Sequence, residues 1–418
     1  MNSFLKDKEI DNIIFKLGVF LLPSAISISI FLFIISIINL SIKEKIFALN
    51  TTFKKIFFTN SLFLILSSIS HSFSNNKNAN AFLSLIGLLN WIPLFVLFFV
   101  SKFYLKTNYQ RQNISSLLLA GSIPLIITGL GQVYFNWTGP WIFLNGLITW
   151  YLKPVDFTGG LTGLFNNVNY AGLWLNMIFP ICLVNVKLQN QRYKKIFFLL
   201  YAILIFICII LTNSRSSWFC LIFSCFLIFR KKFLKYFLFV FSLFGSILIS
   251  SIFLFRTMKE FLTPLTYGIN PFNLKFSDYF IEIFNFGDRL NMWLTSLKII
   301  IENPIWGNGV GSFTKIYFSE TGLIRNHTHN IILELLVNYG LPATLFTITP
   351  IVIIIFLAFK KSFIIENSIN LDQAWVTALL SSLILHLVDI QYYDGKISIL
   401  NWIILAGISN IFISKKFE

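Results

Sequence analysis

Apolar runs long enough to cross a bilayer recur along the whole chain, and this feature limits the possible fold more than any other. Each crossing helix needs roughly 20 apolar residues. Runs such as residues 196–211 do not alternate polar and apolar residues, as the strands of a membrane barrel do. With 56% hydrophobic and 12% charged residues, the 418-residue chain is predicted to be an all-α polytopic membrane protein. We expect residues 1–418 to form one transmembrane domain.

The predicted number of transmembrane helices is about 11–12, and the uncertainty lies in the first apolar run. Residues 12–39 contain Pro23, so they form either one long helix or a pair folded back at the proline. The pair is preferred, because proline supplies the break. The other predicted spans are 56–70, 82–100, 114–130, 168–186, 196–213, 216–229, 237–255, 330–358, 373–390 and 397–413.

The basic residues are unevenly distributed between the two predicted faces of the membrane. Outside the N-terminal tail, 19 of them lie in six short segments that alternate spans place on one side, against 11 on the other side. Cytoplasmic loops are enriched in Lys and Arg. This pattern therefore explains the net charge of +16 without a nucleic-acid partner. It also predicts that a long loop, residues 256–328, lies outside the cytoplasm.

Two arginines are candidates for anion binding. Arg215 lies in a tight polar turn between two apolar runs, where a guanidinium group needs a partner or water. Arg289 lies in the first turn of a predicted amphipathic helix, Asp288–Glu302, where the helix dipole disfavours a cation. Arginine makes forked hydrogen bonds to phosphate. The alternative for both residues is a surface role, with Arg215 extending to the outer interface.

A polar stretch at the end of the long loop is the strongest candidate for chemistry. It contains His327 and His329, and histidine is the side chain best suited to proton transfer near neutral pH. His329 adjoins the start of an apolar helix, whose dipole favours a neutral ring. Asn330 and Glu334 follow on one face of that helix. The alternative reading is a pair of exposed loop histidines and a structural carboxylate.

Two other features are expected to be structural. His386 and Asp389 lie one helical turn apart at the end of a predicted span. The segment Trp306–Phe313 contains three alternating glycines, which predicts a turn or a close approach of the backbone to another group. Its glycine spacing differs from that of dinucleotide-binding loops.

In this order, the motifs resemble those of the bacterial O-antigen ligase and polymerase family. Four segments carry the resemblance: 163–171, 213–216, 289–309, and His329-Asn330 with the residues up to Pro342. The specific part of the resemblance covers about residues 160–345.

The resemblance implies a membrane glycosyltransferase that moves a glycan from an undecaprenyl-diphosphate carrier to an acceptor hydroxyl. The acceptor implied is a glycan or the lipid A-core, and the site lies on the periplasmic side of the bacterial cytoplasmic membrane. Arg215 and Arg289 match the arginines that bind the diphosphate, and His329 matches the catalytic histidine. His327, Asn330, Glu334 and Asn169 are candidates for substrate binding. We expect no metal ion and no cofactor.

Ligase and polymerase activities are not separated by these motifs. The competing class is a membrane transporter or flippase, which handles a lipid-linked glycan or inorganic carbon. A transporter is expected to have charged residues near the middle of the membrane, often in repeated halves. Here the polar residues collect at the predicted outer edge, which favours the transferase.

Overall fold

The computed structural model describes residues 2–43, 51–73, 80–230, 287–365 and 369–412. These residues are almost entirely helical, which confirms the predicted all-α polytopic class. The helices are α1 (Asn2–Leu21), α2 (Ile26–Lys43), α3 (Thr52–Phe73), α4 (Ala81–Gly87), α5 (Ile92–Tyr104), α6 (Asn108–Gly121), α7 (Ile123–Tyr134), α8 (Val155–Thr158), α9 (Val168–Leu188), α10 (Arg192–Leu211), α11 (Arg215–Phe229), α14 (Gly287–Glu302), α15 (Ser312–Thr321), α16 (Ile331–Phe359), α17 (Leu371–His386) and α18 (Gly395–Ile411).

Six helical segments in the described residues are long and apolar enough to cross a membrane. Two shorter apolar helices, α11 and α18, accompany them. The predicted span 237–255 and the first part of the predicted outer loop, residues 256–286, lie outside the described residues. The total of 11–12 spans therefore stays a prediction.

The first apolar run forms the preferred pair of helices. Helix α1 ends at Leu21 and α2 begins at Ile26, with Pro23 in the turn between them. The Ser29 hydroxyl on α2 donates to the Gly18 carbonyl on α1 at 2.7 Å, so the two helices pack directly against each other. The N-terminal tail before the first apolar run is also helical, because α1 already begins at Asn2.

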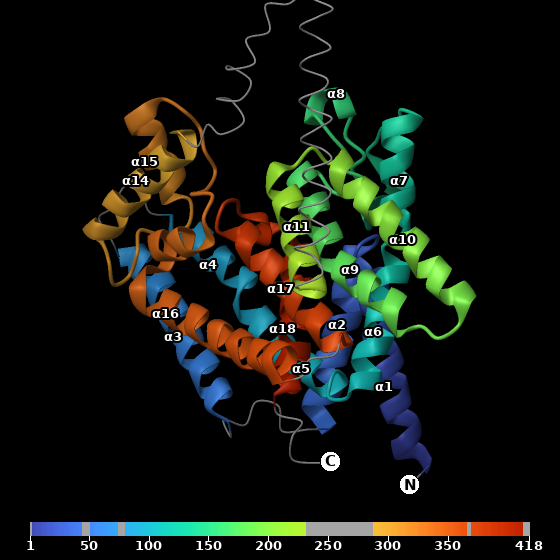
Figure 1. The fold of residues 1–418 in the computed structure, drawn as a ribbon. Helices are drawn as coiled ribbons and strands as arrows, with labels where there is room; N and C mark the ends of the chain where they lie inside the picture. The colour runs from blue at the N-terminus through green and yellow to red at the C-terminus, as the bar shows by residue number, and fades with distance from the viewer. Residues whose placement is uncertain (1, 44–50, 74–79, 231–286, 366–368, 413–418) are drawn as a thin grey trace, which may run out of the picture.

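Helices α9, α17 and α18 form the centre of the bundle (Figure 1). Every residue of α18 from Lys396 to Ile411 is buried. A helix that is largely apolar around its circumference is expected at the centre of a bundle. The three largest fully buried side chains, Trp174, Trp375 and Trp402, lie one on each of these helices.

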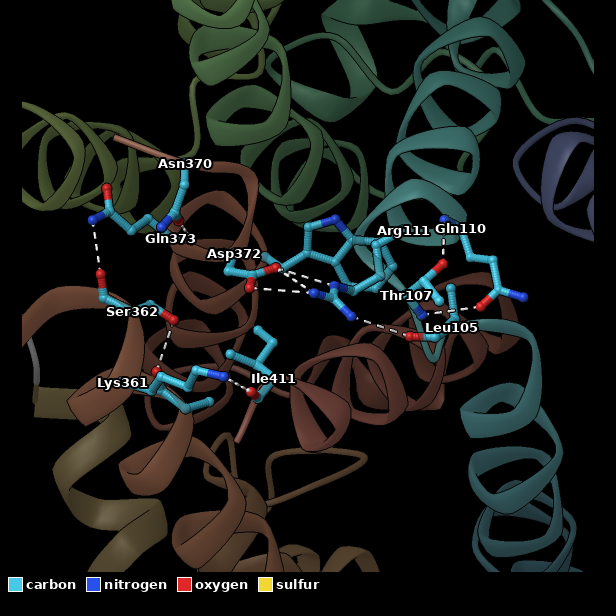
Figure 2. Close-up of polar contacts among 12 residues, drawn as sticks. Leu105, Thr107, Gln110, Arg111, Lys361, Ser362, Asn370, Asp372, Gln373 and Ile411 are labelled. Atoms are coloured by element: carbon cyan, nitrogen blue, oxygen red, sulfur yellow. Dashed lines mark hydrogen bonds and ion pairs between the residues drawn. The ribbon is translucent and has the colours of Figure 1, made fainter. Parts of the chain in front are cut away.

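One end of the bundle is held by an ion pair between helices distant in sequence (Figure 2). The Arg111 Nε and Nη2 atoms of α6 donate to the two carboxylate oxygens of Asp372 in α17, at 3.0 and 3.2 Å. Nearby, the Lys361 ammonium donates to the Ile411 carbonyl at 2.6 Å. A bidentate arginine pair adds geometric specificity as well as energy. The first contact fixes α6 to α17, and the second fixes the segment directly after α16 to the end of α18.

Two predicted spans are broken near a proline. The 114–130 run becomes α6 and α7, separated at Ser122 just before Pro124. The 82–100 run becomes α4, the short 3-10 helix η1 (Leu88–Asn90) and α5, with Pro93 in the first turn of α5. Proline removes a backbone donor and clashes with the preceding turn. The apolar pattern predicted both runs but not the breaks within them.

The segment 131–165 contains a small β-hairpin that the sequence analysis did not predict. Strands β1 (Trp141–Phe143) and β2 (Ile148–Trp150) are antiparallel and are joined by the 3-10 turn η2 (Leu144–Gly146). The Trp141 and Trp150 rings lie 6.3 Å apart on neighbouring strands. Cross-strand aromatic pairs of this kind stabilise a hairpin.

The glycine-rich segment packs against a break in α16, as a close backbone approach predicts. Gly340 has φ +79° and interrupts the helix. The Asn308 amide donates to the Val337 carbonyl at 2.6 Å, and the Leu341 amide donates to the Pro304 carbonyl at 2.8 Å. A Cβ at Gly340 would collide with the Ile305 carbonyl. This segment therefore positions α16 through backbone contacts.

Candidate active site

His329 is placed immediately before α16 by a capping residue. The Asn330 Oδ1 atom accepts hydrogen bonds from the amides of Ile332 and Leu333, at 3.0 and 3.1 Å. Asparagine is among the preferred residues for this position, because its oxygen satisfies amides that have no partner within the helix. His329 itself has φ +54°, a left-handed conformation that is uncommon for residues other than glycine. The backbone thus turns sharply at the predicted catalytic residue.

The His329 ring makes a short contact with a carboxylate from another helix end. The His329 Nδ1 atom lies 2.7 Å from Asp389 Oδ1. An ionised carboxylate only accepts hydrogen bonds, so Nδ1 carries the proton and donates. This tautomer leaves Nε2 with a lone pair. The ring can therefore accept a proton at Nε2, which a general base must do.

Asp389 lies in the turn that follows α17, and it is buried. Burial by itself disfavours its charged form. The hydrogen bond from His329 and the nearby imidazole charge outweigh burial, and they hold the pKa of the Asp389 carboxyl below its usual value. The Ile390 amide also donates to Asp389 Oδ1, at 2.9 Å. The carboxylate is therefore ionised near neutral pH and oriented toward His329.

A chain of hydrogen bonds extends from Asp389 to the start of α11. The Asn169 Nδ2 atom donates to Asp389 Oδ2 at 2.7 Å, and the Ser214 hydroxyl donates to Asn169 Oδ1 at 2.8 Å. Ser214 directly precedes Arg215, the predicted diphosphate ligand. Three of the four sequence motifs are thus joined through side chains, although they are up to 160 residues apart. Asn169 was predicted to bind substrate; in the structure both ends of its amide have protein partners.

Glu334 holds the loop that carries the two histidines. Its Oε2 atom accepts the Thr328 amide at 3.0 Å. Its Oε1 atom accepts the Asn338 side-chain amide at 3.0 Å and the Tyr393 hydroxyl at 3.2 Å. Glu334 is only 5% exposed. Asn330 and Glu334, both predicted to bind substrate, therefore have internal partners that shape the loop.

His327 lies beside His329. Their ring centroids are 4.3 Å apart, and the rings are tilted by 65°. Burial, with a further contribution from His329, lowers the pKa of His327 to about 4, so its ring is neutral at neutral pH. Its Nδ1 atom is buried and has no hydrogen-bond partner within the described part of the chain. His327, His329 and Asp389 could together hold a metal ion, because their ligand atoms all lie within 4.8 Å of one another.

The two predicted arginines lie on different helices. Arg215 is exposed and begins α11, which packs against α9 and α17. Arg289 is half-buried in the first turn of α14, which packs against α16. Figure 1 shows α14 beside α15 and α11 above α17. Next to Arg289, Asp288 pairs at 3.3 Å with Arg325, which lies in the loop that carries His327 and His329. Whether Arg215 and Arg289 share one diphosphate stays a prediction.

An apolar cavity of about 240 Å³ lies next to the histidine cluster. Its wall includes Ile331 and Ile332, directly after the α16 cap, and Leu387, two residues before Asp389. Val352 on the same wall is 54% exposed, so the cavity lies near the apolar outer surface of the bundle. An apolar chain could lie here with its polar end at His329.

Asp389 was expected to be structural, and its contact with His329 was not predicted. The predicted span 373–390 placed Asp389 inside a membrane helix, whereas α17 ends at His386 and leaves Asp389 in a turn. The sequence feature that could have indicated a site residue was a carboxylate close to the predicted outer end of a membrane span. Its partner lies 60 residues away, and only the packing of α16 against α17 brings the two together.

Fold and site define a multi-pass helical membrane protein in which a half-buried histidine pairs with a buried carboxylate at one end of the bundle. Residues 200–348 match the family model described as O-antigen ligase. The match includes Arg215, Arg289, His327 and His329, and it supports the predicted resemblance to the O-antigen ligase family. It indicates a membrane glycosyltransferase of the O-antigen ligase or polymerase type. A search of curated proteins found no match.

Proposed function

We propose that the protein transfers a glycan from an undecaprenyl-diphosphate carrier to an acceptor hydroxyl, with His329 as the general base. The observation that carries this proposal is the 2.7 Å contact between His329 Nδ1 and Asp389 Oδ1. This contact selects the tautomer that can accept a proton and stabilises the imidazolium formed. Asp389 thus positions and supports His329 without touching the substrate.

The proposed step balances without a cofactor. The acceptor O–H gives its proton to His329 Nε2 as the oxygen forms a bond to the anomeric carbon of the donor sugar. The bond between this carbon and the diphosphate oxygen breaks, and its electron pair stays on the leaving diphosphate. Arg215 and Arg289 are assigned to that diphosphate, because guanidinium groups stabilise charge developing on phosphate oxygens.

The proposal also assigns a place to the carrier lipid. The first isoprene units adjoin the diphosphate, so they need an apolar surface beside the polar site. The cavity next to Ile331, Ile332 and Leu387 provides such a surface. A glycan or the lipid A-core is the proposed acceptor, and it approaches from the aqueous side.

We propose that this site faces the periplasm. The basic segments near Arg111 and Lys361 lie at the other end of the bundle, where Figure 2 shows their contacts, and cytoplasmic loops are enriched in basic residues. The test uses a background without the four native cysteines and an impermeant thiol reagent on intact cells. A cysteine at exposed Leu323 should be labelled and one at exposed Tyr109 should not. The reverse pattern would overturn the orientation.

The function is tested with purified protein in liposomes that contain a polyprenyl-diphosphate-linked oligosaccharide. Wild-type protein with an acceptor glycan should yield a lengthened acceptor and free polyprenyl diphosphate. His329→Gln should yield neither product while still binding the donor. If the protein instead moves the intact donor across the bilayer and forms no new glycosidic bond, a flippase function replaces the transferase.

A further inference from the structure

Three metal-ligating side chains meet at the proposed catalytic centre. The ligand atoms of His327, His329 and Asp389 all lie within 4.8 Å of one another. The Nδ1 atom of His327 is buried, and the described residues offer it no hydrogen-bond partner. Two imidazoles and one carboxylate form a donor set that suits zinc and similar divalent ions. A set of three protein ligands leaves a position for water.

The distances are close to those that such an ion needs. Zinc binds imidazole nitrogen at about 2.0–2.1 Å with tetrahedral geometry, which places ligand atoms about 3.3 Å apart. His329 Nδ1 and Asp389 Oδ1 are 2.7 Å apart and must separate slightly. The His327 ring must approach them. Both histidines lie outside the helices, so rotation of their side chains can provide these movements.

We propose that His327, His329 and Asp389 bind a zinc-type divalent ion, and that this ion inhibits the enzyme. The ion takes the position of the proton between His329 Nδ1 and Asp389. An imidazole with a metal ion on Nδ1 carries its proton on Nε2. Nε2 then has no lone pair for the acceptor proton, so the base is blocked. The proposed metal binding does not depend on the proposed function, whereas the proposed inhibition rests on it.

The binding is tested with Co²⁺, whose visible absorption reports tetrahedral coordination. Metal-free protein without a polyhistidine tag is titrated in detergent, and Zn²⁺ is then added as a competitor. Wild type should bind one Co²⁺ that Zn²⁺ displaces. His327→Gln should weaken binding by at least roughly tenfold, since even the loss of an outer partner of a ligand costs 10–100-fold. His71→Gln changes a histidine outside the cluster and should bind as wild type does.

Two results would overturn the proposed metal site. One is the absence of tetrahedral Co²⁺ absorption in wild type, and the other is an equal Co²⁺ affinity for wild type and His327→Gln. If His327→Gln does not fold, Asp389→Asn serves as the second variant with the same expectation.

The inhibition is measured separately, as transfer at increasing Zn²⁺ with reversal by a chelator. Transfer should fall in proportion to Zn²⁺ occupancy, and acceleration by Zn²⁺ would refute it. Co²⁺ binding without any transfer activity would contradict the proposed function alone. Loss of transfer in His329→Gln without Co²⁺ binding to wild type would contradict the metal site alone.

Discussion

Replacement of Glu334 by leucine is expected to slow catalysis by releasing the histidine loop. The carboxylate accepts three hydrogen bonds, one of them from the Thr328 amide next to His329. Leucine leaves this buried amide without a partner. A buried donor left without a partner costs about 1–3 kcal/mol. Taking about 2 kcal/mol for the Thr328 contact alone, the rate constant should fall roughly thirtyfold.

Glu334→Gln provides the conservative comparison. The Asn338 Oδ1 atom has no partner among the described residues, so it can accept from the new amide after its own amide rotates. Most activity should therefore return. The matched control is Asp372→Asn, which removes a carboxylate from the opposite end of the bundle. It should lower the melting temperature and leave kcat unchanged, because Asp372 pairs with Arg111 there.

The assay is steady-state transfer in liposomes over a range of donor concentrations, together with hydrogen exchange of the Thr328 amide. Glu334→Leu should reduce kcat with little change in donor KM, and Thr328 should exchange faster. A Glu334→Leu enzyme with wild-type kcat and an equally protected Thr328 amide would refute the positioning role. Equal losses in Glu334→Leu and Glu334→Gln would show that charge, and not loop geometry, matters.

Two further predictions concern the arginines and the break in α16. Arg215→Lys and Arg289→Lys should each weaken donor binding in a direct binding assay, because an ammonium group cannot replace a guanidinium fork; unchanged affinity in both would remove them from the diphosphate site. Gly340→Ala should destabilise the protein by roughly 3 kcal/mol or more in thermal unfolding. Its φ of +79° with ψ of −177° is a conformation open essentially to glycine only. In addition, the new Cβ would collide with the Ile305 carbonyl. Gly322→Ala, with φ +73° and open space around the Cβ, should cost only about 1–2 kcal/mol, and equal losses in the two variants would contradict this account.

Apolar run length predicted the class of fold correctly, because the cost of crossing a bilayer is set by local sequence. The break at Pro23 and the amphipathic helix over Asp288–Glu302 were also visible locally, and both are present. The hairpin and the broken spans near Pro93 and Pro124 were not predicted. A hairpin or a proline break involves only a few residues. A pattern judged over an apolar run of roughly 20 residues does not detect either of them.

Only those site residues that could be recognised from their type and their position in the sequence were predictable. His329 was identified from its place before an apolar helix, and the structure places it there. The prediction relied on the helix dipole, whereas the structure adds a contact with the Asp389 carboxylate at 2.7 Å, which fixes the tautomer of the ring. Asn169, Asn330 and Glu334 were singled out, but their hydrogen-bond partners depend on how four helices meet. No local pattern encodes a contact such as that between Asn169 and Asp389.

The central claim is that Asp389 acts on transfer through His329, and a double-mutant cycle on the transfer rate tests it directly. His329→Ala should lower the rate by roughly 10²–10⁴-fold, the usual contribution of a general base. Asp389→Asn should also lower the rate, and the double variant should be no slower than His329→Ala alone, because the two residues act as one unit. Multiplied losses in the double variant, or near-normal turnover of His329→Ala, would contradict the account.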